Sequence, residues 1–435
     1  MITRKEYHTR RKTLAARIPA GAIALIPAAG ECIRNADTHY RFRQDSDFFY
    51  LTGFDEPDAL LVITAGASTQ SLLFSRARNP SEEKWTGPRL GQEGAVSELG
   101  MDEAWPMEQL QAQLPELLAG RTAVCFPFGR SPWLEKAIHS AMQSVKMRIR
   151  RGTGAPDILQ DLDPVLGEMR LFKSEAECAL MMRAADISVR AHQRAMAACR
   201  HLDNECQLEA ELVYTFLREG CRANAYDPIV GNGANACVLH YTANNAPLVP
   251  GNLVLIDAGG EYAGYAADIT RTWPVNGRFT PEQRAVYDLV LAAQKAGVEA
   301  VRPGAPWDSI QRIIVDILTR GLCELGILRG NPDALIRDEA YRPYYMHNSG
   351  HWLGLDVHDC GRYRVDGAWR PLEPGMVLTV EPGLYLSADI PGLDARWWNI
   401  GVRIEDDILV TENGHKNLTA ALAVDADSLE ALIRD

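Results

Sequence analysis

The chain has 435 residues, a length at which two or three domains are typical. The formal net charge of −12 argues against a nucleic-acid-binding surface, because phosphate contacts need clustered Lys and Arg. No apolar run reaches the roughly 18 to 20 residues of a membrane span, and the nine cysteines show neither an even count nor a repeated spacing. We therefore expect a cytoplasmic protein with reduced thiols and no membrane partner.

The first third of the chain mixes short buried strands with helices. A helix is predicted over 107–120, because its amphipathic pattern ends at a glycine. Alternation of strands and helices indicates an α/β domain. Gly, Pro and Asp gather in 150–164, so we place the domain boundary there and assign residues 1–165 to this domain. The predicted strands are 23–28, 59–65, 71–75 and 122–128.

Residues 166–435 show long helices between groups of strands. Ser174 and Glu177 have the spacing of a capping box and open a helix over 174–200. Helices that are interleaved with antiparallel strands are typical of an α+β domain. The other predicted helices are 205–220, 281–301 and 306–326, and the predicted strands are 253–257, 262–273, 376–381 and 401–411.

Four carboxylates in this second domain interrupt or end strand-like apolar runs. Asp257 follows an apolar run that starts at Leu253, and Asp268 lies between Ala267 and Ile269. A buried carboxylate is normally neutralised, paired or bound to a metal. Taken singly, each acid is also compatible with a strand end or a turn, and a single histidine with a core position. The full group of candidate ligands is Asp257, Asp268, His351, Glu381 and Glu405.

Four carboxylates and one imidazole suit two divalent cations, with Mn²⁺ first and Co²⁺ or Zn²⁺ as substitutes. Two cations about 3.5–4 Å apart would share a water that loses a proton near neutral pH and becomes a nucleophile. His240 and His347 are candidates for holding the carbonyl oxygen under attack, and His358 is a third. Arg403, two residues before Glu405, either orients ligand carboxylates or forms an ordinary salt bridge.

Seven segments of the chain carry distinctive motifs: 43–62, 167–177, 226–242, 254–273, 347–359, 376–385 and 401–407. Together they resemble the bacterial aminopeptidase P (Xaa-Pro aminopeptidase) family of pita-bread metallopeptidases. The resemblance extends over nearly the whole chain. It implies a small N-terminal α/β domain and a pita-bread catalytic domain over 166–435. It also implies two Mn²⁺ ions per subunit, held by the five candidate ligands.

The resemblance implies hydrolysis of peptides that have proline in second position. A hydroxide between the metals would attack the Xaa–Pro carbonyl, with Glu381 as the proton shuttle and Asp257 beside the free amine of the substrate. His240, His347 and His358 match the substrate-contacting histidines of the family. Family members are commonly homodimers or homotetramers, in which a neighbouring N-terminal domain can wall the active site. The resemblance also implies substrate contacts by Tyr363, Asp37 and Trp85, and Arg403 is a candidate beside them.

The sequence departs from the family pattern in two places. Asn348 follows His347 where the family usually has glycine, and asparagine tolerates a positive φ if that position needs one. The loop 387–399 contains Trp397 and Trp398, which match nothing in the pattern. These tryptophans either narrow the substrate entrance or pack inside the domain.

Four alternatives share the fold. Prolidase has the same ligands but cleaves only Xaa-Pro dipeptides, and the N-terminal segments favour aminopeptidase P over it. Methionine aminopeptidase typically lacks a domain like 1–165. A non-catalytic peptide- or protein-binding module, or the metal-free hydrolase creatinase, would have lost metal ligands, whereas this chain has all five.

Overall fold

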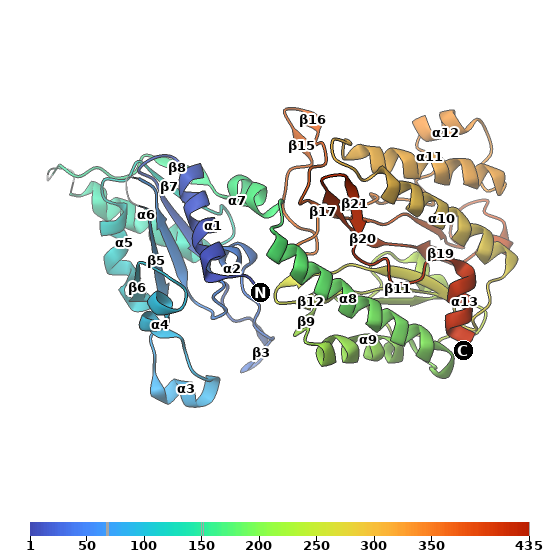
Figure 1. Ribbon diagram of the computed structural model, residues 1–435, viewed down its shortest axis with the longest axis horizontal. Helices are drawn as coiled ribbons and strands as arrows, with labels where there is room; N and C mark the ends of the chain where they lie inside the picture. The colour runs from blue at the N-terminus through green and yellow to red at the C-terminus, as the bar shows by residue number, and fades with distance from the viewer. Residues whose placement is uncertain (67–68, 149, 151, 435) are drawn as a thin grey trace. The chain divides into compact units, whose positions relative to one another are not determined.

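The structure is a computed structural model that describes residues 1–66, 69–148, 150 and 152–434 (Figure 1). The chain divides into two compact units, Ile2–Arg170 and Leu171–Asp435 with Met1, and each unit has a hydrophobic core of its own. The division lies slightly beyond the expected boundary because helix α7 (Asp163–Arg170) belongs to the first unit. Arg170 Nη1 lies 2.8 Å from Asp47 Oδ1 in a buried ion pair, which ties the end of α7 to that unit.

The first unit is built on a mixed six-stranded sheet, which confirms the predicted α/β class. The strand order is β6-β5-β4-β1-β7-β8. Its central strand β1 (Ile23–Pro27) is antiparallel to β4 (Leu60–Thr64) and parallel to β7 (Ala123–Phe126). These strands are apolar on both faces and fully buried, as a sheet covered by helices requires. All four predicted strands are confirmed, with ends shifted by one or two residues.

The remaining elements of the first unit surround this sheet. The helix predicted over 107–120 is confirmed as a short 3₁₀ turn followed by α5 (Leu110–Leu118). The others are α1 (Arg4–Arg17), β2 (Ile33–Asn35), β3 (Thr38–His39), α2 (Ser46–Thr52), β5 (Gln70–Ser75), α3 (Pro80–Thr86), α4 (Gly91–Ser97), β6 (Glu103–Pro106), α6 (Pro132–Lys146) and β8 (Ile158–Asp161).

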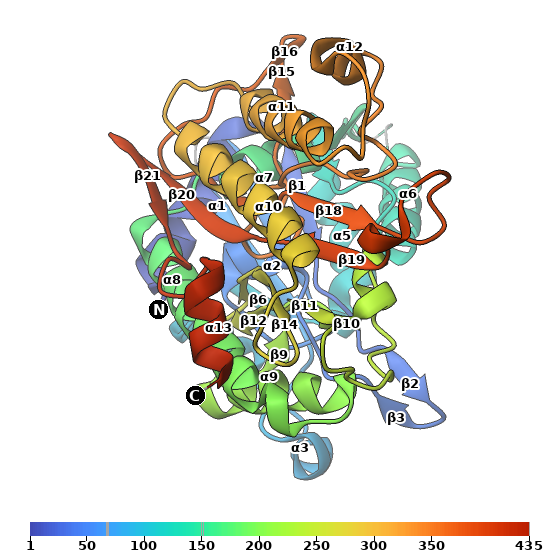
Figure 2. The same ribbon diagram turned by 90° about the vertical axis from the view of Figure 1, so that its right-hand side faces the viewer.

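Four long helices cover the sheets of the second unit (Figures 1 and 2). Helix α8 (Glu175–Ala198) packs against α9 (Glu205–Glu219), and α10 (Pro281–Ala300) packs against α11 (Asp308–Glu324). The predicted capping box is present: the Ser174 side chain accepts from the backbone N–H of Glu177, and the Glu177 side chain accepts from the backbone N–H of Ser174. The four helices predicted in this unit are confirmed, with ends that differ from the predicted ones by at most two residues.

The strands of the second unit form several small antiparallel sheets. Strand β11 (Leu253–Asp257) lies between β10 (Ile229–Asn232) and β14 (Thr270–Pro274). The single strand predicted over 262–273 is wrong, because turns divide that stretch into three. Its three parts are β12 (Gly260–Tyr262), β13 (Tyr265–Ala266) and β14.

The prediction of one strand over 401–411 is also wrong. Strand β19 (Ile400–Arg403) pairs with β18 (Gly383–Leu386), whereas β20 (Asp406–Thr411) pairs with β17 (Val377–Val380). The chain changes partner at Glu405, where it forms an isolated bridge with Thr270. The other elements of this unit are β9 (Ala223–Asn224), α12 (Pro332–Arg337), β15 (Arg364–Val365), β16 (Ala368–Trp369), β21 (Gly414–Asn417) and α13 (Ala426–Arg434).

The first residues of the second unit are part of its buried interior. Leu171 is fully buried, and Lys173 Nζ lies 2.9 Å from Asp359 Oδ2 with both side chains 1% exposed. Gly354 packs so closely that a Cβ there would lie 2.2 Å from Asp359 Oδ2. Lys173 is therefore part of the structure around the loop that carries His358.

Two further observations concern the chain in general. Among the described residues, none of the helices has the length and apolar character needed to cross a bilayer. The nine cysteines are all free thiols.

Candidate active site

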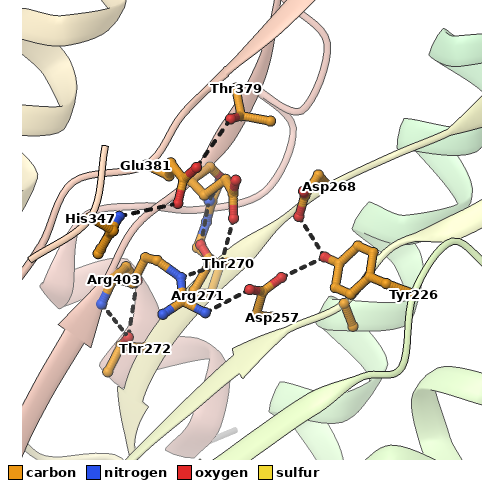
Figure 3. Close-up of polar contacts among 12 residues, drawn as sticks. Tyr226, Asp257, Asp268, Thr270, Arg271, Thr272, His347, Thr379, Glu381 and Arg403 are labelled. Atoms are coloured by element: carbon orange, nitrogen blue, oxygen red, sulfur yellow. Dashed lines mark hydrogen bonds and ion pairs between the residues drawn. The ribbon is translucent and has the colours of Figure 1, made fainter. Parts of the chain in front are cut away.

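Five side chains from separate elements of the second unit line one cavity. Figure 3 labels three of them, Asp257, Asp268 and Glu381. Asp257 ends strand β11, and Asp268 lies two residues before β14, which pairs with β11. Glu381 directly follows β17, and Glu405 lies at the partner change between β19 and β20. His351 joins them because its carbonyl accepts from Thr379 N of β17 at 2.9 Å.

Three of these residues form a compact group of possible ligand atoms. Asp268, His351 and Glu405 each offer one atom, and these atoms all lie within 4.8 Å of one another. His351 Nε2 lies 3.3 Å from Asp268 Oδ2 and 3.8 Å from Glu381 Oε1. One imidazole among several carboxylates is a donor set that suits first-row divalent metals.

Tyr226 connects the remaining carboxylate to this group. Its hydroxyl lies 2.5 Å from Asp257 Oδ1 and 2.5 Å from Asp268 Oδ1. The two aspartates therefore turn toward the same small volume (Figure 3). Asp257 therefore lies next to the group formed by Asp268, His351 and Glu405.

The electrostatics of the group favour a bound cation. Burial, followed by the charges of Asp268 and Glu381, raises the pKa of Glu405 well above its usual range. Burial also raises the pKa of Glu381 to about 7 and raises that of Asp257. Burial acts to raise the pKa of Asp268 as well, but the hydrogen bond from His351 lowers it overall. A divalent cation would relieve the repulsion that these buried carboxylates exert on one another.

Arg403 contacts a candidate ligand directly. Its Nη2 donates to Asp257 Oδ2 at 2.6 Å, and its Nη1 donates to the Tyr385 hydroxyl at 3.0 Å. Its Nε lies 3.1 Å from Thr270 Oγ1, whose hydroxyl is 2.6 Å from Glu405 Oε2. Arg403 therefore holds Asp257 in place from the side of β19.

The three predicted histidines line one cavity with the candidate ligands. The cavity has a volume of about 1070 Å³, and every residue that lines it lies between 225 and 405. Tyr363 and Arg403 line it as well. Asp37 and Trp85 belong to the first unit, where Asp37 lies in the turn between β2 and β3 and Trp85 lies in α3 with 90% of its surface exposed.

His347 is held as a neutral ring. Its Nδ1 lies 2.8 Å from Asn348 O and 3.6 Å from Glu381 Oε2, and its Nε2 lies 2.9 Å from the Tyr385 hydroxyl. Burial, and then the charge of Arg403, lowers the pKa of His347 to about 4.

The other two histidines have different surroundings. The ring of His358 meets the ring of His351 edge-on, with centroids 4.3 Å apart, and burial lowers its pKa. His240 lines the cavity.

The two departures from the family pattern have simple structural outcomes. Asn348 does not adopt a positive φ, so its position makes no demand for glycine. Trp397 is 4% exposed and packs into the core of the second unit. Trp398 is 46% exposed and donates through Nε1 to Leu393 O at 3.0 Å. Neither tryptophan lines the cavity.

Sequence reasoning missed several residues of the site: Tyr226, Thr270, Gln311, Thr379 and Tyr385. Thr270 carries a usable signal, because it lies two residues after Asp268 and alternation places both on one face of an extended chain. Tyr226 and Gln311 act on partners that are distant in sequence, and no local pattern marks such residues.

The comparisons with known proteins agree with this geometry. Residues 179–412 match the model of metallopeptidase family M24, and residues 7–126 match that of the aminopeptidase P N-terminal domain. The chain is 46% identical to a Xaa-Pro aminopeptidase of Escherichia coli, with 99% of this chain and 98% of that protein covered. It is 43% identical to a Xaa-Pro aminopeptidase of Haemophilus influenzae, with the same coverage.

Solved structures give the same result. The aminopeptidase PepP of Pseudomonas aeruginosa superposes with a TM-score of 0.97 at 45% identity, covering 100% of this chain and 98% of that one. The proline aminopeptidase P II of Yersinia pestis superposes with a TM-score of 0.96 at 47% identity, covering both chains fully. These matches also confirm the predicted fold, with its N-terminal α/β domain and pita-bread domain. The chain therefore belongs to metallopeptidase family M24, within the group that carries the aminopeptidase P N-terminal domain.

Proposed function

We propose that this metal-dependent Xaa-Pro aminopeptidase releases the N-terminal residue from peptides with proline in second position, using two divalent cations. The observation that carries the proposal is the convergence of Asp268, His351 and Glu405 within 4.8 Å, beside a cavity of about 1070 Å³. The proposed metal ligands are Asp257, Asp268, His351, Glu381 and Glu405.

Mn²⁺ is the proposed cation, with Co²⁺ or Zn²⁺ able to substitute. Carboxylate oxygens favour Mg²⁺, Mn²⁺ or Ca²⁺, and an imidazole shifts the preference toward first-row transition metals. When bound, such cations lower the pKa of water enough to supply a hydroxide nucleophile near neutral pH. The repulsion among the buried carboxylates supports a high positive charge at this place.

Glu381 is the proposed proton shuttle. Its carboxylate lies at the cavity wall, and burial raises its pKa to about 7. A carboxylate within hydrogen-bond reach of the attacking water can take its proton and return it to the leaving proline nitrogen. His347 Nδ1 lies 3.6 Å from Glu381 Oε2, so His347 is next to the proposed proton shuttle.

The substrate would be held by side chains that line the cavity. Asp257 is proposed to accept from the free amine of the peptide, while Arg403 keeps its carboxylate in position. Hydrogen-bond donors near the scissile carbonyl stabilise the oxyanion that forms on attack. The proposed peptide contacts are His240, His347, His358, Tyr363 and Arg403.

The proposal includes a cytoplasmic homodimer or homotetramer and peptide contacts by Asp37 and Trp85. The exposure of these two side chains supports the proposed contacts, since Trp85 is 90% exposed and Asp37 lies in an exposed turn. Large exposed aromatic side chains are enriched where proteins meet other molecules. Light scattering of the purified protein would give the oligomer count.

The function is tested with three peptides and the Mn²⁺-loaded enzyme. These are a Xaa-Pro-Xaa tripeptide, a Xaa-Pro dipeptide and a Met-Ala-Ser control, each run with and without a chelator. We expect cleavage of the tripeptide, loss of that cleavage on chelation, and recovery when Mn²⁺ is returned.

The other outcomes contradict parts of the proposal. Cleavage of the dipeptide alone would make the protein a prolidase. Cleavage of Met-Ala-Ser would remove the proline requirement. If metal is bound and no peptide is cleaved, the chain is a binding module of the same fold.

A further inference from the structure

We propose that Gln311 is a positioning residue that sets the geometry of the segment 347–351. This segment carries His347, a proposed substrate contact, and His351, a proposed metal ligand. Gln311 lies in helix α11, which contributes none of the five proposed ligands. The inference rests on the proposed function for His351 as a metal ligand and for the kinetic readout.

Gln311 holds the centre of the segment through one atom. Its Oε1 accepts from Ser349 N at 2.7 Å and from Ser349 Oγ at 2.7 Å. A backbone N–H can only donate, so the atom that faces it must be the carboxamide oxygen. Gln311 therefore serves Ser349 as a hydrogen-bond acceptor.

The opposite side of the segment is fixed by the chain around β17. Ser349 O accepts from Glu381 N at 2.9 Å, and His351 O accepts from Thr379 N at 2.9 Å. Between them, Gly350 approaches so closely that a Cβ would lie 2.1 Å from Thr379 O. The segment is thus held between a strand on one side and the Gln311 side chain on the other.

Loss of the Gln311 oxygen would release only one of these sides. Ser349 is 2% exposed, so its N–H would be left buried without its acceptor, which is destabilising. The Ser349 hydroxyl would keep Tyr345 as a partner, since the two oxygens are 2.6 Å apart. The segment would then shift to find a new partner for the N–H.

Such a shift would move both functional histidines. His347 lies two residues before Ser349 and His351 two residues after it. Catalytic groups need placement within about 0.5 Å, so a displaced segment disturbs metal affinity and turnover together. A residue that contacted only the peptide would change KM and leave metal affinity unchanged.

The experiment compares Gln311→Met with Gln311→Glu in the full-length protein. Methionine has a similar length and helix propensity but no strong acceptor, whereas glutamate keeps an acceptor oxygen for Ser349. Gln111→Met makes the same change at an exposed position of α5 and is the matched control. Mn²⁺ affinity is measured by titration at pH 8, and kcat and KM are measured with the Xaa-Pro-Xaa tripeptide.

We expect Gln311→Met to lower Mn²⁺ affinity and kcat by about tenfold or more, the usual effect of losing a group that orients a ligand. Gln311→Glu should keep Mn²⁺ affinity and kcat within about threefold of the parent, because the acceptor remains. Gln111→Met should match the parent in both.

Three results would overturn the proposal. If Gln311→Met keeps its Mn²⁺ affinity, or Gln311→Glu loses as much as Gln311→Met, the acceptor role is excluded. If both variants raise KM alone, Gln311 contacts the peptide instead. Should Gln311→Met fail to fold, the glutamate variant decides alone. A parent protein that binds Mn²⁺ but cleaves nothing would refute the proposed function and leave the affinity test intact.

Discussion

Glu405 and Asp406 are adjacent and equally buried, at 2% exposure each, but the protein treats them differently. Asp406 accepts from the fully buried Arg271 at 2.7 Å, from Gln294 at 2.6 Å and from Thr419 at 2.6 Å. Glu405 faces the other side of the strand and accepts a hydrogen bond from the Thr270 hydroxyl. Its pKa is raised, mainly by burial and further by the charges of neighbouring carboxylates.

The difference distinguishes a structural charge from a binding charge. Around Asp406 the fold supplies its own cation and completes the hydrogen bonds, so nothing further is required. Around Glu405 several carboxylates share one histidine, and a cation from outside is the natural complement. Four measurements test how separate these two regions are, beginning with the largest expected effect.

Arg271→Met removes the cation of the structural region. We expect the free energy of unfolding to fall by about 3–5 kcal/mol, because Asp406 loses its buried counter-charge. Urea unfolding of the metal-loaded protein measures this. Arg320→Met is the control, since Arg320 forms exposed pairs with Asp316 and Asp333 and should leave the free energy of unfolding nearly unchanged. Equal effects of the two changes would contradict a special role for the Arg271 region.

Asp268→Asn removes a charge from the binding region. We expect loss of metal from at least one site and a fall in peptide hydrolysis of at least about hundredfold. Metal analysis and a tripeptide assay measure both effects, with the exposed Asp427→Asn as control. Retention of two metals with full activity would exclude Asp268 as a ligand.

Metal affinity should also depend on pH. Burial raises the pKa of Glu381 to about 7, and pairing with Asp268 raises that of His351 to about 9 although burial opposes it. Both groups hold protons in the metal-free protein at pH 6, and a cation must displace them. Affinity for Mn²⁺ should therefore rise between pH 6 and 8, by about tenfold per pH unit for each proton released. Calorimetry in two buffers counts the protons, and a pH-independent affinity would contradict the assignment.

His347→Ala acts at the edge of the binding region. We expect turnover to fall by about hundredfold, the lower end for a group that stabilises the oxyanion, while metal content stays unchanged. The exposed His139→Ala is the control. Loss of metal from His347→Ala would place His347 among the metal ligands.

Much of the second unit could be predicted from the sequence alone. Asp257 ends an apolar run, and a carboxylate in that setting is expected to be neutralised, paired with a basic side chain or bound to a metal ion. The capping box at Ser174 predicts the start of α8 correctly, because both partners lie within one helical turn. Local signals of this kind need no knowledge of the fold.

Features that depend on distant partners could not be predicted. The alternation of apolar residues continues through Ile404, so the change of partner between β19 and β20 leaves no mark in the pattern. Similarly, nothing near Gln311 indicates that its oxygen meets Ser349. The relation between Glu405 and Asp406 requires Arg271, which lies on another strand.

The buried pair of Lys173 and Asp359 determines how the second unit could be produced alone. The match to family M24 begins only at residue 179. A truncated chain that started there would lose Leu171, Lys173 and the Ser174 cap, and would remove the cation that faces Asp359 beside His358. Expression of the isolated catalytic unit must therefore include the residues from Leu171 onward, ahead of the homology boundary.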